Sequence, residues 1–203
     1  MMTLGTLFII SAPSGAGKTS LVAELLRRIE NIQVSVSHTT RPSRNGETDG
    51  LDYHFVSHQQ FEKMVESQQF VEHAKVHSNY YGTSEEWLNA TLNQGVDVIL
   101  EIDWQGAEQV RQKFPHSKSI FILPPSKQAL FDRLKGRGQD SDEVIQQRVA
   151  AAKEEMSHYT DADYLIINDQ FELACKQLEN IIQAKRCELD SQQHEKLLID
   201  LLS

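Results

Sequence analysis

Apolar residues along this chain of 203 residues form short strand-like runs separated by stretches with helical spacing. The strand-like runs cover residues 7–11, 33–37, 96–102, 119–123 and 164–168. Between most of them, apolar residues recur every three or four positions, as they do in a helix that packs on a sheet. The alternation predicts an α/β fold, with a mostly parallel sheet flanked by helices.

A loop of small residues directly follows the first strand-like run and precedes a helical pattern. It reads Ala12, Pro13, Ser14, Gly15, Ala16, Gly17, Lys18, Thr19. The glycines let backbone N–H groups wrap phosphate oxygens, the lysine meets the outer phosphates, and the threonine hydroxyl binds Mg²⁺. Ala12 stands where the usual pattern has its first glycine, and we expect it to be tolerated. The loop predicts binding of a nucleoside triphosphate with Mg²⁺.

Two segments interrupt the alternation of strands and helices. Residues 37–87 contain several turn signals and a helix start in which Ser57 and Gln60 form a capping box, so they predict a small α+β insert. In the second segment, 126–156, one helix is expected to end at Gly136-Arg137-Gly138 and another to start near Asp140. Helices flanked by glycine in this way can hinge.

Long motifs in the insert and near residue 100 carry a family resemblance. They are Ser-His-Thr-Thr-Arg-Pro-Ser-Arg-Asn-Gly-Glu at 37–47, Gly-Leu-Asp-Tyr-His-Phe at 50–55, Glu72, Tyr-Tyr-Gly-Thr at 80–83, and Glu-Ile-Asp-Trp-Gln-Gly at 101–106. With the phosphate loop they closely resemble guanylate kinase, over nearly the whole chain up to Asn168. The resemblance implies the nucleoside monophosphate kinase form of the phosphate-loop (P-loop) fold and phosphoryl transfer from ATP to GMP. It also implies a core of residues 1–36, 88–125 and 157–203, a GMP-binding insert at 37–87 and a helical lid at 126–156.

The insert carries groups suited to a phosphate monoester. Guanidinium forks and a phenol hydroxyl hold such a dianion well, and Arg41, Arg44 and Tyr53 supply them from one turn-rich segment. The resemblance adds Tyr81 as a further contact to the GMP phosphate. Taken singly, the two arginines would be ordinary solvated charges. Because Ser37, Tyr53 and Glu72 occur in the same insert, we interpret the arginines as a phosphate clamp.

The remaining polar groups of the insert suit guanine. A carboxylate can accept from both N1–H and the N2 amino group, while hydroxyls serve O6, and adenine offers no such donor pair. Glu72 with Ser37 and Thr83 fits this arrangement. Thr83 with Glu86 is also a possible capping box at the start of the following helix, and the two roles can coexist.

Acidic residues end the strand-like run at 96–102. A carboxylate at this position commonly lies beside the magnesium ion in such folds, so we expect Asp103 on the metal side, acting through water, and Glu101 on the GMP side. The alternative for either residue is a cap at the end of the strand.

Arginines of the lid segment are candidates for neutralising charge during phosphoryl transfer, which needs positioning more than a protein nucleophile. The family pattern favours Arg137 and Arg148, whereas Arg133 is expected to be a solvated helix residue. Asn168, at the end of the last strand-like run, is a weaker candidate for contact with the adenine of ATP.

Composition and charge narrow the class of protein further. A net charge of −9 and a pI near 5.3 argue against a nucleic-acid-binding protein. No apolar stretch approaches 18 residues and no signal segment is evident, so we expect no membrane association and a cytoplasmic protein.

The pairs His54/His58 and His73/His77 lack a clear third ligand and do not indicate a metal site. Leucines and isoleucines in the C-terminal tail predict terminal helices, which either form a homo-oligomer or pack back on the core.

Two other functions remain open at this stage. A kinase acting on a phosphorylated sugar such as ribose bisphosphate would share the loop and the lid, but it would have little use for Ser37, Glu72 and Thr83. A scaffold module resembling guanylate kinase would bind peptides without catalysis, but such modules lose features of the phosphate loop that this chain keeps. The sequence therefore favours ATP and GMP as substrates, and we expect dGMP to be accepted as well.

Overall fold

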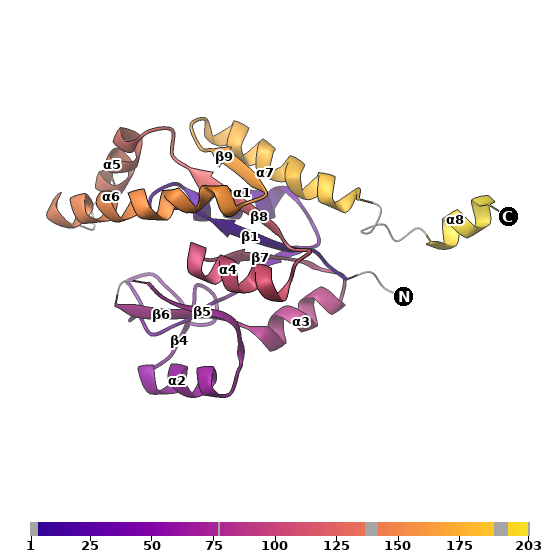
Figure 1. Cartoon of the computed structure of the whole chain (residues 1–203), viewed down its shortest axis with the longest axis horizontal. Helices are drawn as coiled ribbons and strands as arrows, with labels where there is room; N and C mark the ends of the chain where they lie inside the picture. Colours follow the sequence, from indigo (N-terminus) through magenta and orange to yellow (C-terminus); the bar gives the residue numbers. More distant parts are fainter. Residues whose placement is uncertain (1–3, 77, 137–141, 189–194, 203) are drawn as a thin grey trace.

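A five-stranded parallel sheet forms the centre of the molecule (Figure 1). The computed structural model describes residues 4–76, 78–136, 142–188 and 195–202. The strand order is β2-β7-β1-β8-β9, and each pair of neighbours is parallel. The bounds are β1 Leu7–Ser11, β2 Ile32–Val34, β7 Asp97–Glu101, β8 Lys118–Leu123 and β9 Tyr164–Ile167. The predicted α/β class is confirmed.

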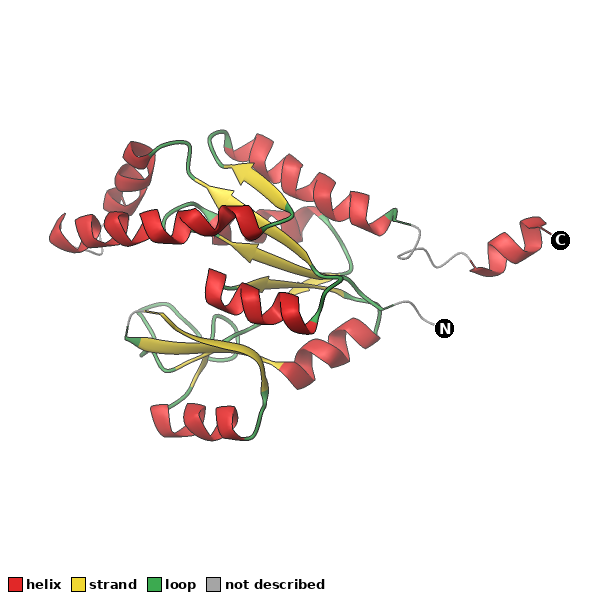
Figure 2. Cartoon of the chain, viewed as in Figure 1, coloured by secondary structure: helices red, strands yellow, loops and turns green. Residues whose placement is uncertain are grey.

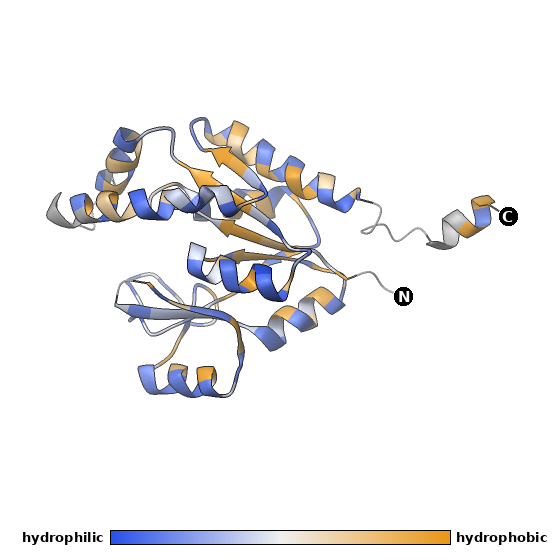
Figure 3. Cartoon of the chain, in the orientation of Figure 1, coloured by the Kyte–Doolittle hydropathy of each residue, from blue (hydrophilic) through white to orange (hydrophobic). Residues whose placement is uncertain are grey.

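Helices cover both faces of this sheet because its central strands are apolar on both sides (Figures 2 and 3). Phe8 and Ile10 of β1 belong to the core cluster under α1 (Lys18–Arg28) and α7 (Phe171–Arg186). Leu7 and Ile9 point the other way, into the cluster under α3 (Glu85–Asn93) and α4 (Trp104–Lys113). This alternation within one buried strand is the two-residue period of β structure.

The insert forms a second sheet with the order β4-β3-β6-β5. Its elements are β3 His38–Thr39, β4 His54–Phe55, α2 His58–Glu66, β5 Phe70–Val76 and β6 Asn79–Ser84. The predicted capping box at the start of α2 is present, with reciprocal hydrogen bonds between Ser57 and Gln60. Strand β5 packs on α4 and places Val71 in a core cluster, so the insert is attached to the body of the protein beside β7.

The segment expected to be a lid contains α5 (Lys127–Gly136) and α6 (Asp142–Ser157), followed by a short 3₁₀ helix, His158–Asp161. The two helices share a small apolar cluster of Leu130, Leu134, Ile145 and Ala152. Helix α5 reaches Gly136, the last described residue before the gap, and the rest of the predicted boundary, Arg137, Gly138 and Asp140, lies outside the described residues.

Two local expectations are wrong. The strand predicted at 33–37 is Ile32–Val34, because after Ser35 the chain leaves the central sheet to enter the insert. Thr83 does not cap the next helix; the cap of α3 is Ser84, whose hydroxyl accepts from the backbone N–H of Trp87. The side chain of Thr83 points instead to Glu72.

The C-terminal tail is helical over Phe171–Arg186 and Glu195–Leu202, as predicted. Helix α7 buries Ala174, Cys175, Leu178 and Ile182 against the core, so most of its apolar face is covered. Helix α8 (Glu195–Leu202) exposes Ile199, Leu201 and Leu202. None of the helices within the described ranges is long and apolar enough to cross a membrane.

Candidate functional site

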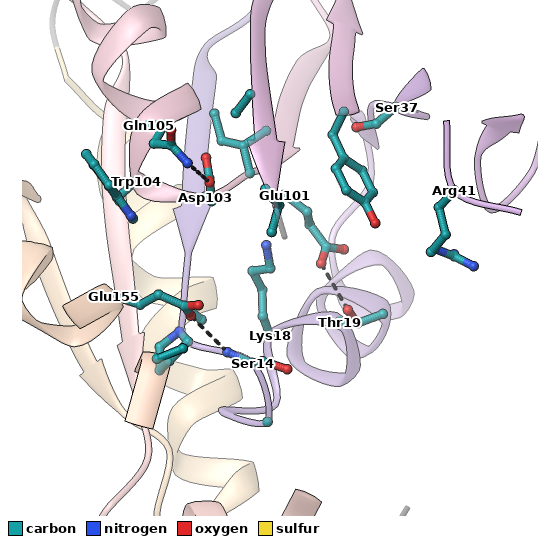
Figure 4. A pocket seen from close by; sticks show the side chains of 18 of the residues that line it. Ser14, Lys18, Thr19, Ser37, Arg41, Glu101, Asp103, Trp104, Gln105 and Glu155 are labelled. Atoms are coloured by element: carbon teal, nitrogen blue, oxygen red, sulfur yellow. Dashed lines mark hydrogen bonds between the residues drawn. The ribbon is translucent and has the colours of Figure 1, made fainter. Parts of the chain in front are cut away.

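A cavity of about 590 Å³ opens where β1 and β7 end, between the phosphate loop, the insert and α6 (Figure 4). The carboxyl edge of a parallel sheet is the usual place for a ligand site in this class of fold. Most of the predicted site residues line it: Ala12, Pro13, Ser14, Gly15, Gly17, Lys18, Thr19, Ser37, Arg41, Arg44, Tyr53, Glu72, Tyr81, Glu101, Asp103 and Arg148. Ala16, Thr83 and Asn168 do not line the cavity but contact residues that do.

The phosphate loop has the backbone that its glycines predict. Gly15 and Gly17 have φ values of 90° and 95°, in the left-handed region where a Cβ is disfavoured. Gly17 is the N-cap of α1, so the N-terminus of that helix faces the cavity with its partial positive charge. Among the described residues other than glycine, only Asn31 and Gln68 have positive φ. Ala12 therefore adopts an ordinary backbone conformation, which explains why alanine is tolerated there.

Two side chains from distant parts of the chain, neither of which lines the cavity, form hydrogen bonds with the backbone of this loop. Asn168 Nδ2 donates to the carbonyl oxygen of Ala16 at 2.8 Å, and an Arg133 nitrogen donates to the same oxygen at 3.2 Å. Arg133 also donates to the carbonyl of Asn168 at 2.7 Å. The expectation that Arg133 is only a solvated helix residue is therefore wrong. The side chain of Asn168 is buried at this contact, and its contact with adenine stays a prediction.

Lys18 lies among carboxylates. Burial lowers the pKa of its ammonium group, while the negative charges of Glu101, Asp103, Glu155 and Glu72 act in the opposite direction. Figure 4 shows Lys18 rising from the loop toward the ends of Glu101 and Asp103. A cation whose charged form is disfavoured by its surroundings gains most from an added anion, so the surroundings of Lys18 favour a bound phosphate.

The acidic residues after β7 have different partners. The Thr19 hydroxyl donates to Glu101 Oε2 at 3.1 Å, so Glu101 lies beside the phosphate loop, although the sequence placed it on the GMP side. Asp103 is the N-cap of α4: Oδ1 accepts from the N–H of Gly106, and Oδ2 accepts from Gln105. The alternative role of a cap thus holds for Asp103. A hydroxyl and a carboxylate beside the phosphate site are ligands that suit Mg²⁺ bound to a triphosphate.

The arginine expected to clamp the acceptor phosphate is held by a residue that the sequence did not identify as part of the site. Glu47 accepts two hydrogen bonds from the Arg41 guanidinium, at 2.7 and 3.0 Å, and a third from the backbone N–H of Arg44. The Arg41 guanidinium also lies 5.2 Å from the centre of the Tyr53 ring. This paired geometry fixes the orientation of Arg41 before any ligand binds. The only sequence signal was the position of Glu47 at the end of the first long motif.

Glu72 is a buried carboxylate, with 3% of its surface exposed, at the insert side of the cavity. The Thr83 hydroxyl donates to Glu72 Oε1 at 2.7 Å. Burial raises the pKa of Glu72 to about 7, and the hydrogen bond from Thr83 partly opposes this rise. Because a hydroxyl has one proton, Thr83 positions Glu72 in this structure, and Ser37 is the predicted hydroxyl left to serve guanine O6.

Gly106 leaves the space that Glu72 occupies. A Cβ at this position would lie 2.5 Å from Glu72 Oε2 and 3.1 Å from its carboxyl carbon. We expect Gly106→Ala to displace the carboxylate and raise the KM for GMP about tenfold, with a much smaller change in the KM for ATP. Steady-state kinetics with each substrate varied in turn measure this. The matched control is Gly136→Ala, since no atom lies within 4 Å of a Cβ there; an equal effect of both variants would refute the explanation.

The lid segment reaches the cavity through α6. Arg148 of this helix lines the cavity, as expected, while Arg137 lies outside the described residues.

In the histidine pairs, His54 stacks on His38 with ring centres 4.6 Å apart, and His77 lies outside the described ranges. In the part of the chain that the structure describes, no group of three His, Cys, Asp or Glu residues is placed to hold a metal ion.

Comparisons with known proteins decide the family. Residues 5–185 match the family model for guanylate kinase. The chain belongs to the guanylate kinase family. It is 57% identical to the guanylate kinase of Saccharophagus degradans and 55% identical to that of Escherichia coli, and each match covers the full length of both chains. The crystal structure of guanylate kinase from Anaplasma phagocytophilum is similar with a TM-score of 0.81 at 33% identity, covering 98% of this chain and 95% of that one.

Proposed function

We propose that this chain transfers the γ-phosphoryl group of ATP to GMP, giving ADP and GDP in purine nucleotide metabolism. The observation that carries the proposal is the buried carboxylate of Glu72 in the same cavity as a phosphate loop of the guanylate kinase family. A carboxylate can accept from both N1–H and the N2 amino group of guanine. The family, the loop and this acceptor together support GMP over other acceptors.

On the ATP side, backbone N–H groups of the loop and Lys18 hold the phosphates, and Arg148 of α6 lines the same cavity. The family resemblance gives Arg137 the same role of neutralising charge on the phosphates. Thr19 would hold Mg²⁺, with Glu101 and Asp103 nearby to bind its waters; when bound, the ion neutralises charge on the β- and γ-phosphates. On the other side, the phosphate of GMP meets Arg41, Arg44, Tyr53 and Tyr81. Together, the residues of the ATP side and of the GMP side place the γ-phosphate of ATP in line with the phosphate of GMP and exclude water.

The ionisation of Glu72 predicts a pH dependence for GMP. Because its pKa is raised to about 7, the carboxyl is protonated in part of the molecules at pH 7 and in most of them at lower pH. Only the ionised form accepts two N–H groups, so the KM for GMP is expected to be constant at high pH and to rise toward tenfold per unit below about pH 7. Initial rates with GMP varied from pH 5.5 to 9 measure this.

Thr83→Val provides the control for this pH profile. It removes the hydrogen bond that lowers the pKa of Glu72 and keeps the shape of the side chain, so the inflection should move to higher pH. An inflection that stays in place, or a KM for GMP that does not change with pH, would contradict the role given to Glu72.

A catalytically inactive scaffold is the alternative from another class. Glycine geometry in the loop, and Lys18 and Thr19 in the cavity, favour nucleotide binding. Isothermal titration with ATP in the presence and absence of Mg²⁺ separates the two functions: the proposal expects binding that Mg²⁺ strengthens, and a chain that binds no ATP would be a scaffold.

We further propose that the protein acts in the cytoplasm, accepts dGMP as well as GMP, and forms a homo-oligomer through its C-terminal helices. The exposure of Ile199, Leu201 and Leu202 on α8 supports self-association, because an exposed apolar face gains by burial. Light scattering on the intact chain and on Leu201→Glu tests this, and a monomer in both samples would contradict it.

A further inference from the structure

A carboxylate from the lid segment contacts the phosphate loop. Glu155, near the end of α6, accepts a hydrogen bond at 3.3 Å from the backbone N–H of Ser14 (Figure 4). Its side chain is half-buried and lines the cavity together with Lys18. Glu155 is also one of the carboxylates whose charge raises the pKa of Lys18, against the larger effect of burial. A negative group of the protein thus lies within the site expected for negative phosphates.

The N–H of Ser14 is one of the donors that a phosphate loop offers to a nucleotide. An N–H group has one hydrogen, so the carboxylate of Glu155 and a phosphate oxygen cannot both accept it at full strength. Two like charges at hydrogen-bond separation also repel strongly when they are partly removed from water. Occupancy of the loop by phosphate and the contact of Glu155 with Ser14 therefore oppose each other.

A second contact lies three residues after Glu155, at the start of the 3₁₀ helix that follows α6. The ring of His158 stacks on Trp104, with centroids 3.9 Å apart and an angle of 4° between the planes. Trp104 is the first residue of α4, directly after Asp103. Glu155 of α6 thus contacts the phosphate loop, and His158, the first residue of the 3₁₀ helix that follows α6, packs on α4. The neighbouring Glu154 also lines the cavity but is exposed.

We propose that Glu155 is an internal substitute for a nucleotide phosphate. It binds the N–H of Ser14 when the loop holds no nucleotide, and the phosphates of ATP or ADP displace it. The inference rests on the proposed function, since it takes the loop as the ATP site. Displacement frees the carboxylate at the end of α6, so nucleotide binding is coupled to the contact of this helix with the loop. Because that contact must break first, the apparent affinity for nucleotide is lower than it would be without Glu155.

The test is the affinity for ADP, measured by titration calorimetry without Mg²⁺. Glu155→Gln keeps the size of the side chain but removes its charge, which weakens the contact with Ser14 and ends the repulsion. We expect it to bind ADP roughly tenfold more tightly than the unaltered chain. Glu155→Ala, which removes the acceptor, should tighten binding at least as much. Affinity for GMP, which does not contact Ser14, should stay within about twofold of the original value, a result that general loosening of the fold would not give.

Glu154→Gln is the matched control, because it makes the same change of charge one residue away, and it should alter the affinity for ADP by less than about twofold. Unchanged or weaker binding of ADP by both Glu155 variants would overturn the proposal, as would equal tightening by Glu154→Gln. If the Glu155 variants bound ADP more weakly than the unaltered chain, and only in the presence of Mg²⁺, the proposal would also be overturned. That result would assign Glu155 to the metal. Failure of the unaltered chain to bind ADP would instead contradict the proposed function.

Discussion

Lys18→Ala is expected to lower kcat for phosphoryl transfer from ATP to GMP by about 10²- to 10³-fold, the cost typical of removing one group that stabilises transition-state charge. The effect is on the chemical step because charge moves onto oxygens that the ammonium group faces as the phosphoryl group passes to GMP. Initial rates at saturating ATP and GMP measure it.

The fold of this variant should survive. Burial lowers the pKa of Lys18, so the charged ammonium is disfavoured in the empty site and its removal relieves that cost. The midpoint of thermal unfolding without nucleotide should therefore be unchanged or slightly higher. Lys63→Ala, at an exposed position on α2, serves as the control and should keep full activity. Turnover near that of the unaltered chain by Lys18→Ala would show that the phosphate loop does not carry the reaction.

Glu72→Gln should produce the second large effect, a fall of about 10²- to 10³-fold in kcat/KM for GMP. The amide replaces one acceptor with a donor, so one of the two guanine N–H groups meets an N–H group in a buried site. The KM for ATP should change little. Kinetics with GMP varied at saturating ATP measure the effect.

The control for this variant is Glu86→Gln, which makes the same change of charge at an exposed position on α3. It should leave kcat/KM for GMP unchanged. Because ionised Glu72 is disfavoured by burial, the neutral amide should not weaken folding at pH 8. If Glu72→Gln kept most of its activity with GMP, another residue would have to recognise guanine.

The parts of the site that local geometry determines could be predicted from the sequence. Gly15 and Gly17 have left-handed backbones, and the loop leads from β1 into α1, because these features depend on neighbours in the chain. The parallel sheet likewise follows from apolar runs such as Leu7–Ser11. The family motifs selected Arg41 and Glu72, which the structure places in one cavity.

Contacts between distant segments could not be predicted in the same way. The sequence contains many exposed charges, and nothing local distinguishes Glu155 or Arg133, which contact the phosphate loop 141 and 117 residues away. The choice between Thr83 and Ser84 as the helix cap was also decided by a long-range effect. Thr83 is buried opposite Glu72 on the neighbouring strand, so its hydroxyl is used there and the next residue caps the helix.

The central claim is that one cavity joins an ATP-binding loop to a site that recognises guanine. The most direct measurement is a coupled phosphotransfer assay with ATP and Mg²⁺, comparing kcat/KM for GMP, dGMP, AMP, CMP and UMP. We predict turnover of GMP, with dGMP accepted, and a kcat/KM for AMP lower by a factor on the order of 10⁴, because adenine would leave the buried Glu72 without its donors. Equal or better turnover with AMP would contradict the claim.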